Sequence, residues 1–191
     1  MTIRARLLPI VLVAGGVVSL SVNAAAGRPE VNPDAAIIQD FEKRVAAYVE
    51  LRGKVESKLP QLKATPSQDE ITHREKELAL AIRETRKTAR PGDIFKPEIA
   101  AEVRRLVGLA MRQGNGKRIN DSIKSAEPVQ IQLRVNEQYP GNVQLQSMPP
   151  SLLMNLPPLP KELEYRLAGQ DLLLLDTKPN LVVDFISNVS H

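Results

Sequence analysis

The sequence predicts an α+β domain in which an antiparallel helical hairpin and a third helix pack on a small antiparallel sheet of about four strands. Between residues 35 and 124, apolar side chains recur at intervals of three and four, the period of a helix that buries one face. Beyond residue 125 the interval falls to two, as in strands. Short links containing proline and glycine separate these segments, so neighbouring elements should run antiparallel.

The first helix is expected over residues 35–59. Asp34 stands at the position of an N-cap. Pro60 should end the helix, because proline lacks an N–H donor and clashes with the preceding turn. One face of this helix is apolar apart from one arginine, and its members are Ile38, Phe41, Val45, Tyr48, Arg52, Val55 and Leu59.

Two further helices should follow. Ser67 and Glu70 form a capping box at the start of the second helix, which we expect to reach about Ala89. The third helix opens at Pro97, since proline suits the first helical position. Its inner face should be formed by Ile99, Val103, Leu106 and Ala110.

The region after the helices begins with the clearest strand pattern of the chain. Apolar and polar residues alternate over 129–135, and Val143 and Leu145 mark a short second strand. Residues 148–160 carry five prolines among leucine and methionine, so this segment cannot be a central strand. We expect it to lie extended over the core as an apolar clamp.

The C-terminal residues predict a three-stranded meander over 164–168, 171–176 and 181–186. Gly169 and Gln170 supply the first tight turn. The unbroken leucine run at 172–175 is typical of a strand buried on both faces. Asp171 and Asp176 flank that strand and are interpreted as turn residues.

Residues 1–26 have the pattern of a secretory signal peptide. Arg4 and Arg6 precede an apolar stretch, and small residues place cleavage between Ala26 and Gly27. We therefore expect an exported protein, periplasmic or secreted, with a flexible segment at 27–34 and one domain at 35–191. The alternative is an uncleaved anchor in the inner membrane, because residues 7–26 approach the ~20 residues of a spanning helix.

Composition excludes several chemistries. The chain has no cysteine, which excludes disulfides, thiol catalysis and cysteine-ligated zinc. Three Phe, three Tyr and no Trp argue against the stacking platforms of nucleic-acid binding, so no nucleic-acid partner is expected. The predicted helical part, 35–124, is basic, with 19 Lys and Arg against 13 Asp and Glu. The predicted β part, 125–191, is acidic, with 4 against 7.

Several C-terminal strings occur together: Leu163-Glu164-Tyr165-Arg166-Leu167, Gly169, Asp171-Leu172, Asp176 and Asn180-Leu181-Val182-Val183-Asp184-Phe185-Ile186. With the proline segment 155–160 and the turn 92–95, they resemble a group of uncharacterised exported bacterial proteins. The resemblance implies export and a bacterial source. It implies no activity, and it transfers no catalytic residue.

Carboxylates are the catalytic candidates, because phosphate-binding loops and nucleophile elbows are absent from the sequence. Glu164 and Asp184 are the candidate acid and base, and two such groups can hydrolyse a glycosidic bond. Tyr165 and Arg166 are candidate ligand-binding residues beside them. If Asp184 points inward, Arg166 is its expected partner, and a structural ion pair is the simpler interpretation. With two histidines in the chain, neither a metal site nor a cofactor is expected.

A basic stripe gives a second set of candidate binding residues. The spacing predicts that Arg83, Arg86, Lys87 and Arg90 share one helix face. Such a face can meet phosphate or an anionic membrane surface, although a solvated face is the simpler interpretation.

Three hypotheses on function follow. The leading one is an exported, non-enzymatic protein that binds a partner or small ligand, with the proline-rich segment lining a groove. The first alternative is a carboxylate-dependent hydrolase. The second is an envelope-associated protein that docks through the basic helix face.

Overall fold

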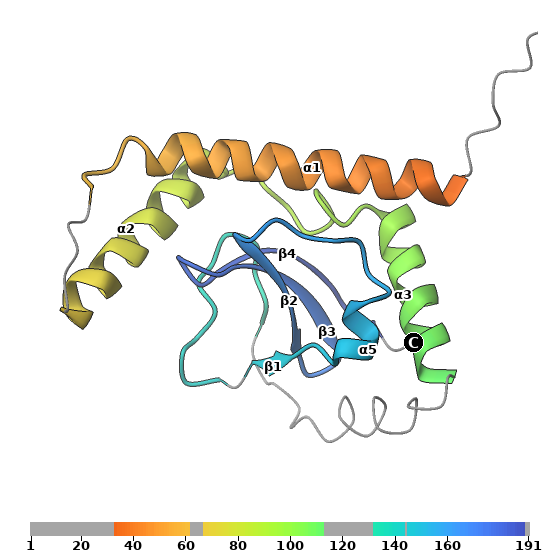
Figure 1. Cartoon of the computed structure of the whole chain (residues 1–191). Coiled ribbons are helices and arrows are strands. Elements are labelled where there is room, and N and C mark those ends of the chain that lie inside the picture. Colours follow the sequence, from red (N-terminus) through yellow and green to blue (C-terminus); the bar gives the residue numbers. More distant parts are fainter. Residues whose placement is uncertain (1–32, 62–66, 113–131, 144, 190–191) are drawn as a thin grey trace, which may run out of the picture. The chain divides into compact units, whose positions relative to one another are not determined.

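The structure is a computed structural model that describes residues 33–61, 67–112, 132–143 and 145–189 (Figure 1). The elements are α1 (Pro33–Glu56), α2 (Gln68–Thr85), α3 (Pro97–Arg112), β1 (Gln146–Ser147), α5 (Pro150–Leu153), β2 (Leu163–Ala168), β3 (Asp171–Asp176) and β4 (Leu181–Ile186). The predicted α+β class is confirmed. The predicted signal peptide and its cleavage site at Ala26–Gly27 lie outside the described residues. Among the described residues, no helix is long and apolar enough to span a membrane.

Helix α1 begins one residue before Asp34, which therefore lies in the first turn rather than at the N-cap. The helix ends at Glu56 because the chain tightens before Pro60 is reached. The backbone amide of Lys58 donates to Val55 (3.2 Å) and that of Leu59 to Glu56 (3.1 Å), so the last turns close over three residues instead of four.

Helix α2 begins as predicted, since the Ser67 side chain accepts a hydrogen bond from the amide of Glu70 at 3.4 Å. The prediction that α2 reaches Ala89 is wrong, because it ends at Thr85 and Arg86 leaves the helical conformation as the C-cap. Figure 1 shows α2 returning toward α1, which gives the predicted hairpin. In α3, Val107 is fully buried, whereas the predicted inner residue Leu106 is only half-buried.

The sheet has the strand order β1-β2-β3-β4, and all neighbouring pairs are antiparallel. The predicted meander is confirmed as β2, β3 and β4. Gly169 adopts a φ of 60° in the first turn, a conformation that glycine reaches without strain. The second turn ends at Asn180, another left-handed residue, whose side-chain amide donates to the carbonyl of Tyr139 at 2.8 Å.

The prediction of a strand at 129–135 is wrong for its described residues, which form no strand at 132–135. Asn136 has a φ of 64°, so the extended alternation ends in a turn. The chain then bonds to the edge of β4, with Asn136 donating to Val182 (2.8 Å) and Tyr139 to Asn180 (2.8 Å). The predicted short strand at 143–145 is wrong for its described residues, 143 and 145, which are not in a strand, and the fourth strand is β1, which begins at the next residue.

Residues 148–160 cover the core, but the prediction that they are extended is wrong. Pro149 and Pro150 open the short helix α5, where proline suits the first helical positions. Met148, Leu152 and Leu156 are buried beneath this helix, whereas Leu153 and Met154 point into solvent. The segment is therefore apolar on both its inner and its outer side.

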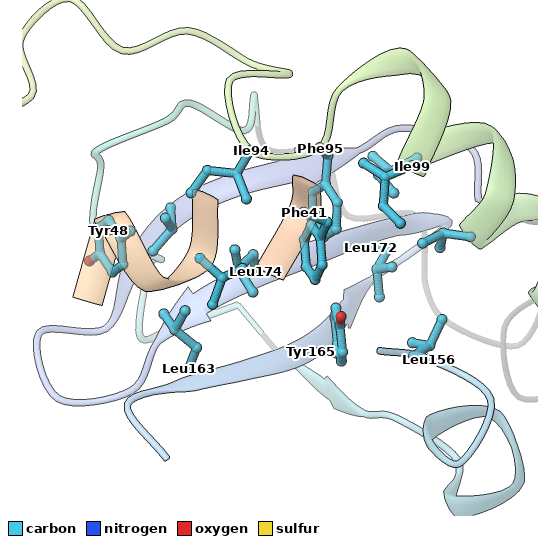
Figure 2. Close-up of a cluster of buried hydrophobic side chains, with 14 of the residues drawn as sticks. Phe41, Tyr48, Ile94, Phe95, Ile99, Leu156, Leu163, Tyr165, Leu172 and Leu174 are labelled. Carbon is cyan, nitrogen blue, oxygen red and sulfur yellow. The ribbon is translucent and has the colours of Figure 1, made fainter. Parts of the chain in front are cut away.

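The main core lies between the helices and one face of the sheet. Phe41 of α1 stacks on Phe95 with ring centroids 5.5 Å apart, and Phe95 stacks on Tyr165 of β2 at 6.5 Å (Figure 2). Leu172 and Leu174 face this core. Leu173 and Leu175 face the other side of the sheet, where they pack with Tyr139 and Val182. The prediction that this strand is buried on both faces is confirmed.

A β-bulge in β4 brings Asp184 to the helix-facing side. Leu174 pairs with Asp184 and Leu175 with Val182, which leaves Val183 without a partner in register. The fully buried carboxylate of Asp184 accepts backbone hydrogen bonds from Gly92 (2.9 Å) and from Ile94, Phe95 and Phe185 (2.8 Å each). It therefore ties the connector between α2 and α3 to the sheet.

Replacing Asp184 by asparagine should lower the free energy of unfolding by about 3 kcal/mol, because one amide oxygen cannot serve four donors and its NH2 group would face them. Urea unfolding of the purified protein measures this loss. The matched control is Asp171→Asn, since Asp171 accepts a single backbone bond, from Asn188 at 3.0 Å. A loss at Asp184 no larger than the control's would contradict the assigned role.

Candidate functional site

A groove of about 700 Å³ runs beside β2. Its walls come from the end of β1, from α5 and the following prolines, and from β2. Most of the lining side chains are apolar. The lining residues are Ser147, Met148, Leu153, Met154, Leu156, Pro157, Pro158, Leu159, Leu163, Glu164, Tyr165 and Arg166.

The groove exists because β1 is too short to cover β2. Its two residues pair with Arg166 and Leu167, after which the chain turns into α5. Among the described residues, no strand pairs with the stretch from Leu163 to Tyr165 on that side. The prolines that follow α5 cannot replace the missing partner, because they lack N–H donors. Instead the Pro157 carbonyl accepts from the Tyr165 hydroxyl at 3.1 Å.

The rim of the groove carries both signs of charge. Arg166 pairs with Glu164 at 2.7 Å and donates to the Ser147 hydroxyl at 3.2 Å. Two further lining residues are exposed, with Leu153 at 48% and Met154 at 82%. Two large apolar side chains held in water beside a groove are typical of a contact surface for an apolar partner.

The predicted polar set does not form one site. Glu164, Tyr165 and Arg166 line the groove, but Asp184 is fully buried on its four amides. The predicted Arg166–Asp184 pair is wrong, because Arg166 pairs with Glu164. Tyr165 faces the core, where burial raises the pKa of its hydroxyl well above the ordinary value. The acid–base pair on which the hydrolase hypothesis depends is therefore not assembled.

The predicted basic stripe also separates. The prediction of one helix face is wrong, since α2 ends at Thr85. Arg86 turns inward, donates to Asn136 at 2.7 Å and lies 4.9 Å from the centre of the Tyr48 ring. Arg83 and Lys87 stay exposed beside Glu137 and Glu84, and Arg90 is exposed beyond the helix. A continuous cationic face is not formed by these four residues.

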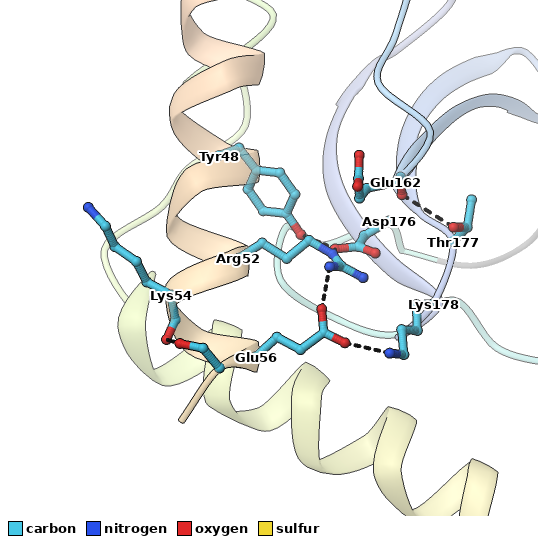
Figure 3. Close-up of polar contacts among 9 residues, drawn as sticks. Tyr48, Arg52, Lys54, Glu56, Glu162, Asp176, Thr177 and Lys178 are labelled. Carbon is cyan, nitrogen blue, oxygen red and sulfur yellow. Dashed lines mark hydrogen bonds and ion pairs between the residues drawn. The ribbon is translucent and has the colours of Figure 1, made fainter. Parts of the chain in front are cut away.

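A buried polar network connects α1 to the turn after β3 (Figure 3). The Asp176 carboxylate accepts from the Tyr48 hydroxyl and from Arg52 Nε, both at 2.7 Å. Arg52 also donates to Glu56 at 2.6 Å, and Glu56 pairs with Lys178. The interpretation of Asp176 as a turn residue missed this role. The signal was Arg52 in an apolar helix face, because a buried guanidinium needs an anion.

Burial and the charges within the network shift the pKa values of its members. Burial raises the pKa of Asp176 above its ordinary value, an effect that outweighs the hydrogen bond from Tyr48 and the charge of Arg52. Burial disfavours the Arg52 cation, yet the Asp176 and Glu56 carboxylates raise the pKa of Arg52. The hydrogen bond from Lys178 holds the pKa of Glu56 below its ordinary value despite partial burial.

Histidine and metal chemistry are the remaining candidates in the described part of the chain. His73 is exposed, with its Nε2 atom 3.4 Å from Glu77. No group of three or more His, Asp or Glu side chains among the described residues is arranged to hold a metal ion.

No protein-family model, curated protein or solved structure matches this chain. The fold and the site therefore define only a class: an α+β protein with a groove along a partly unpaired strand edge. The resemblance of residues 163–186 to exported bacterial proteins stays a prediction.

The pH dependence of stability should reveal the buried network. A raised pKa means that the folded protein binds the Asp176 proton more tightly than the unfolded chain does. Ionisation of Asp176 therefore costs stability as the pH rises above its ordinary pKa of 3.8. The free energy of unfolding of the wild type, minus that of Asp176→Asn, should fall as the pH rises and then level off above the folded pKa.

Glu56 provides a control of opposite sign. Its lowered pKa stabilises the fold above the ordinary value of 4.5, and this contribution is lost as the pH falls. The difference between the wild type and Glu56→Gln should thus shrink toward low pH. Urea unfolding across a pH series measures both differences, and two differences with the same pH slope would contradict the assigned environments.

Proposed function

We propose that this chain is an exported, non-enzymatic binding protein that takes up an extended apolar polypeptide segment in the groove beside β2. The observation that carries the proposal is the partly unpaired edge of β2, which lies next to the exposed Leu153 and Met154 side chains. An open strand edge offers backbone donors and acceptors, and an adjacent apolar wall offers contact for alternate side chains.

The dimensions and chemistry of the groove support this mode of binding. A volume of about 700 Å³ lies within the range of ligand-binding pockets. An added strand would continue the line of β1 past Ser147 and pair with the stretch from Leu163 to Tyr165. The polar rim of Glu164 and Arg166 would lie beside the backbone of the bound segment and fix its position.

A binding role is favoured over catalysis by the state of the carboxylates. Glu164 is held by Arg166, and Asp184 is held by backbone amides.

Export is supported by the signal-peptide pattern of residues 1–26. Mass spectrometry of the protein from the culture or periplasmic fraction should find a mature N-terminus at Gly27. A chain that retains Met1 or Thr2 would mean an anchor instead.

The binding mode is tested with a short, capped peptide of alternating valine and threonine. NMR titration of the purified protein should shift the backbone amides of β2 from Leu163 to Arg166. The same peptide with alternate backbone nitrogens methylated cannot donate to a strand, so it should bind about tenfold more weakly or not at all. Equal binding of both peptides, or shifts confined to other elements, would exclude strand addition here.

The apolar rim is tested by Met154→Asp, which places a charge where the proposal needs an apolar contact. The dissociation constant of the peptide should rise about tenfold, because an apolar contact is lost and a charge is placed against an apolar segment. Because Met154 is 82% exposed, the variant should keep its folding stability. The matched control is Leu80→Asp on α2, which is 63% exposed and lies outside the groove lining. A similar loss in both variants would count against the groove.

A further inference from the structure

The end of β1 closes one end of the groove beside β2. Ser147, the last residue of β1, pairs in register with Arg166, and its hydroxyl accepts from Arg166 Nη1 at 3.2 Å. Figure 1 shows the chain leaving β1 toward α5 directly afterwards. The edge of β2 beside Arg166 is therefore occupied. A segment laid along the remaining edge, from Tyr165 to Leu163, meets β1 at one of its ends.

The direction of the sheet decides which end of the segment meets β1. All neighbouring strands of the sheet are antiparallel, and antiparallel pairing is slightly more stable per residue than parallel pairing. A segment added antiparallel to β2 runs in the same direction as β1. Its first residues therefore lie next to Ser147, beside Tyr165 and Glu164, and its later residues lie beside Leu163 and beyond. The N-terminal end of the segment is the end that meets β1.

Glu164 carries an available acceptor at this end of the groove. Its side chain lines the groove and is 46% exposed, so an incoming donor can reach it. Arg166 uses only one of the two carboxylate oxygens, because its Nε and Nη2 atoms contact Oε2 at 2.8 and 2.7 Å. Within the described part of the chain, no group donates to Oε1 of Glu164. A carboxylate oxygen in this state can accept from a charged donor of a ligand.

The rest of the groove offers contacts of a different kind. Beyond the Glu164–Arg166 pair, the lining is formed mainly by leucine, methionine and proline side chains, including the exposed Leu153 and Met154. These walls suit apolar side chains and provide no partner for a second charge. The groove therefore matches a segment with one positive charge at its start and apolar residues after it.

We infer that the groove beside β2 binds the free N-terminal end of an extended apolar polypeptide, with its α-ammonium group donating to Glu164 Oε1. This inference rests on the function proposed above and specifies which part of the partner is bound. A chain that begins beside Ser147 fits the open edge without a bend, whereas an internal segment would have to turn away from the sheet where β1 begins. The carboxylate also compensates the ammonium charge, which is unfavourable to desolvate without a partner.

The test compares three peptides of the same alternating valine and threonine sequence, all amidated at the C-terminus. The first has a free N-terminus, the second is N-acetylated, and the third is N-acetylated with lysine as its second residue. Calorimetric titration at about pH 6.5, where an α-amino group with a pKa of about 7.7–8.0 is charged, should show the free peptide binding about tenfold more tightly than the acetylated one. At about pH 9.5 the amine is neutral, and the two affinities should become equal.

The outcomes separate this inference from the proposed function. Equal binding of the free and the acetylated peptide at the lower pH would overturn the inference and leave strand addition standing. Failure of all three peptides to bind would overturn both. If the acetylated lysine peptide bound as tightly as the free peptide, the groove would recognise a lysine side chain rather than a chain terminus, and the inference would be wrong.

A variant assigns the contact to one carboxylate. Glu164→Gln should reduce the tenfold preference for the free peptide to about twofold or less, while the affinity for the acetylated peptide stays the same. The matched control is Glu162→Gln, two residues earlier, because Glu162 is half-buried and lies outside the groove lining. The control should keep the full preference. An equal loss in the two variants would contradict the contact with Glu164.

Discussion

Two carboxylates buried on the helix-facing side of the sheet fix the position of the helical layer. Asp176 meets Tyr48 and Arg52 of α1, and Asp184 meets the backbone of the connector that leads into α3. Apolar contacts between a helix and a sheet tolerate sliding, because the hydrophobic effect has no direction. A buried carboxylate must face its donors, so each of these contacts specifies one arrangement. The aromatic stack of Phe41, Phe95 and Tyr165 adds an apolar contact that joins α1, the connector and β2.

The groove beside β2 lies where this arrangement leaves the edge of the sheet open. The helices cover one face of the sheet, and the loop that contains Tyr139 packs on the other. At the outer edge of β2, only the two residues of β1 pair with it among the described residues. The groove therefore lies beside an ordered sheet, and the strand edge that forms it stays open.

The sequence predicted the parts of the fold that depend on local periodicity. The meander from Leu163 to Ile186 and the capping box at Ser67 were correct because hydrophobic spacing and turn residues determine them directly. The predictions failed where one side chain overrides the period. Asn136 turns the chain at the end of the predicted strand 129–135. Its side chain also accepts a hydrogen bond from Arg86, which therefore points inward and leaves the predicted basic helix face. Of the predicted site residues, Glu164, Tyr165 and Arg166 line the groove. Asp184 does not, because a β-bulge turned it toward backbone amides that no sequence pattern identifies.

Native-state hydrogen exchange of the connector amides tests the role of the buried carboxylates most directly. Ile94 and Phe95 lie in a loop, where amides normally exchange rapidly. If Asp184 holds the connector to the sheet, these two amides should exchange only on global unfolding, at the rate of the core amides of β3. Exchange as fast as that of the exposed turn at Gly141 would contradict the account, since Asp184 would then not hold the connector to the sheet.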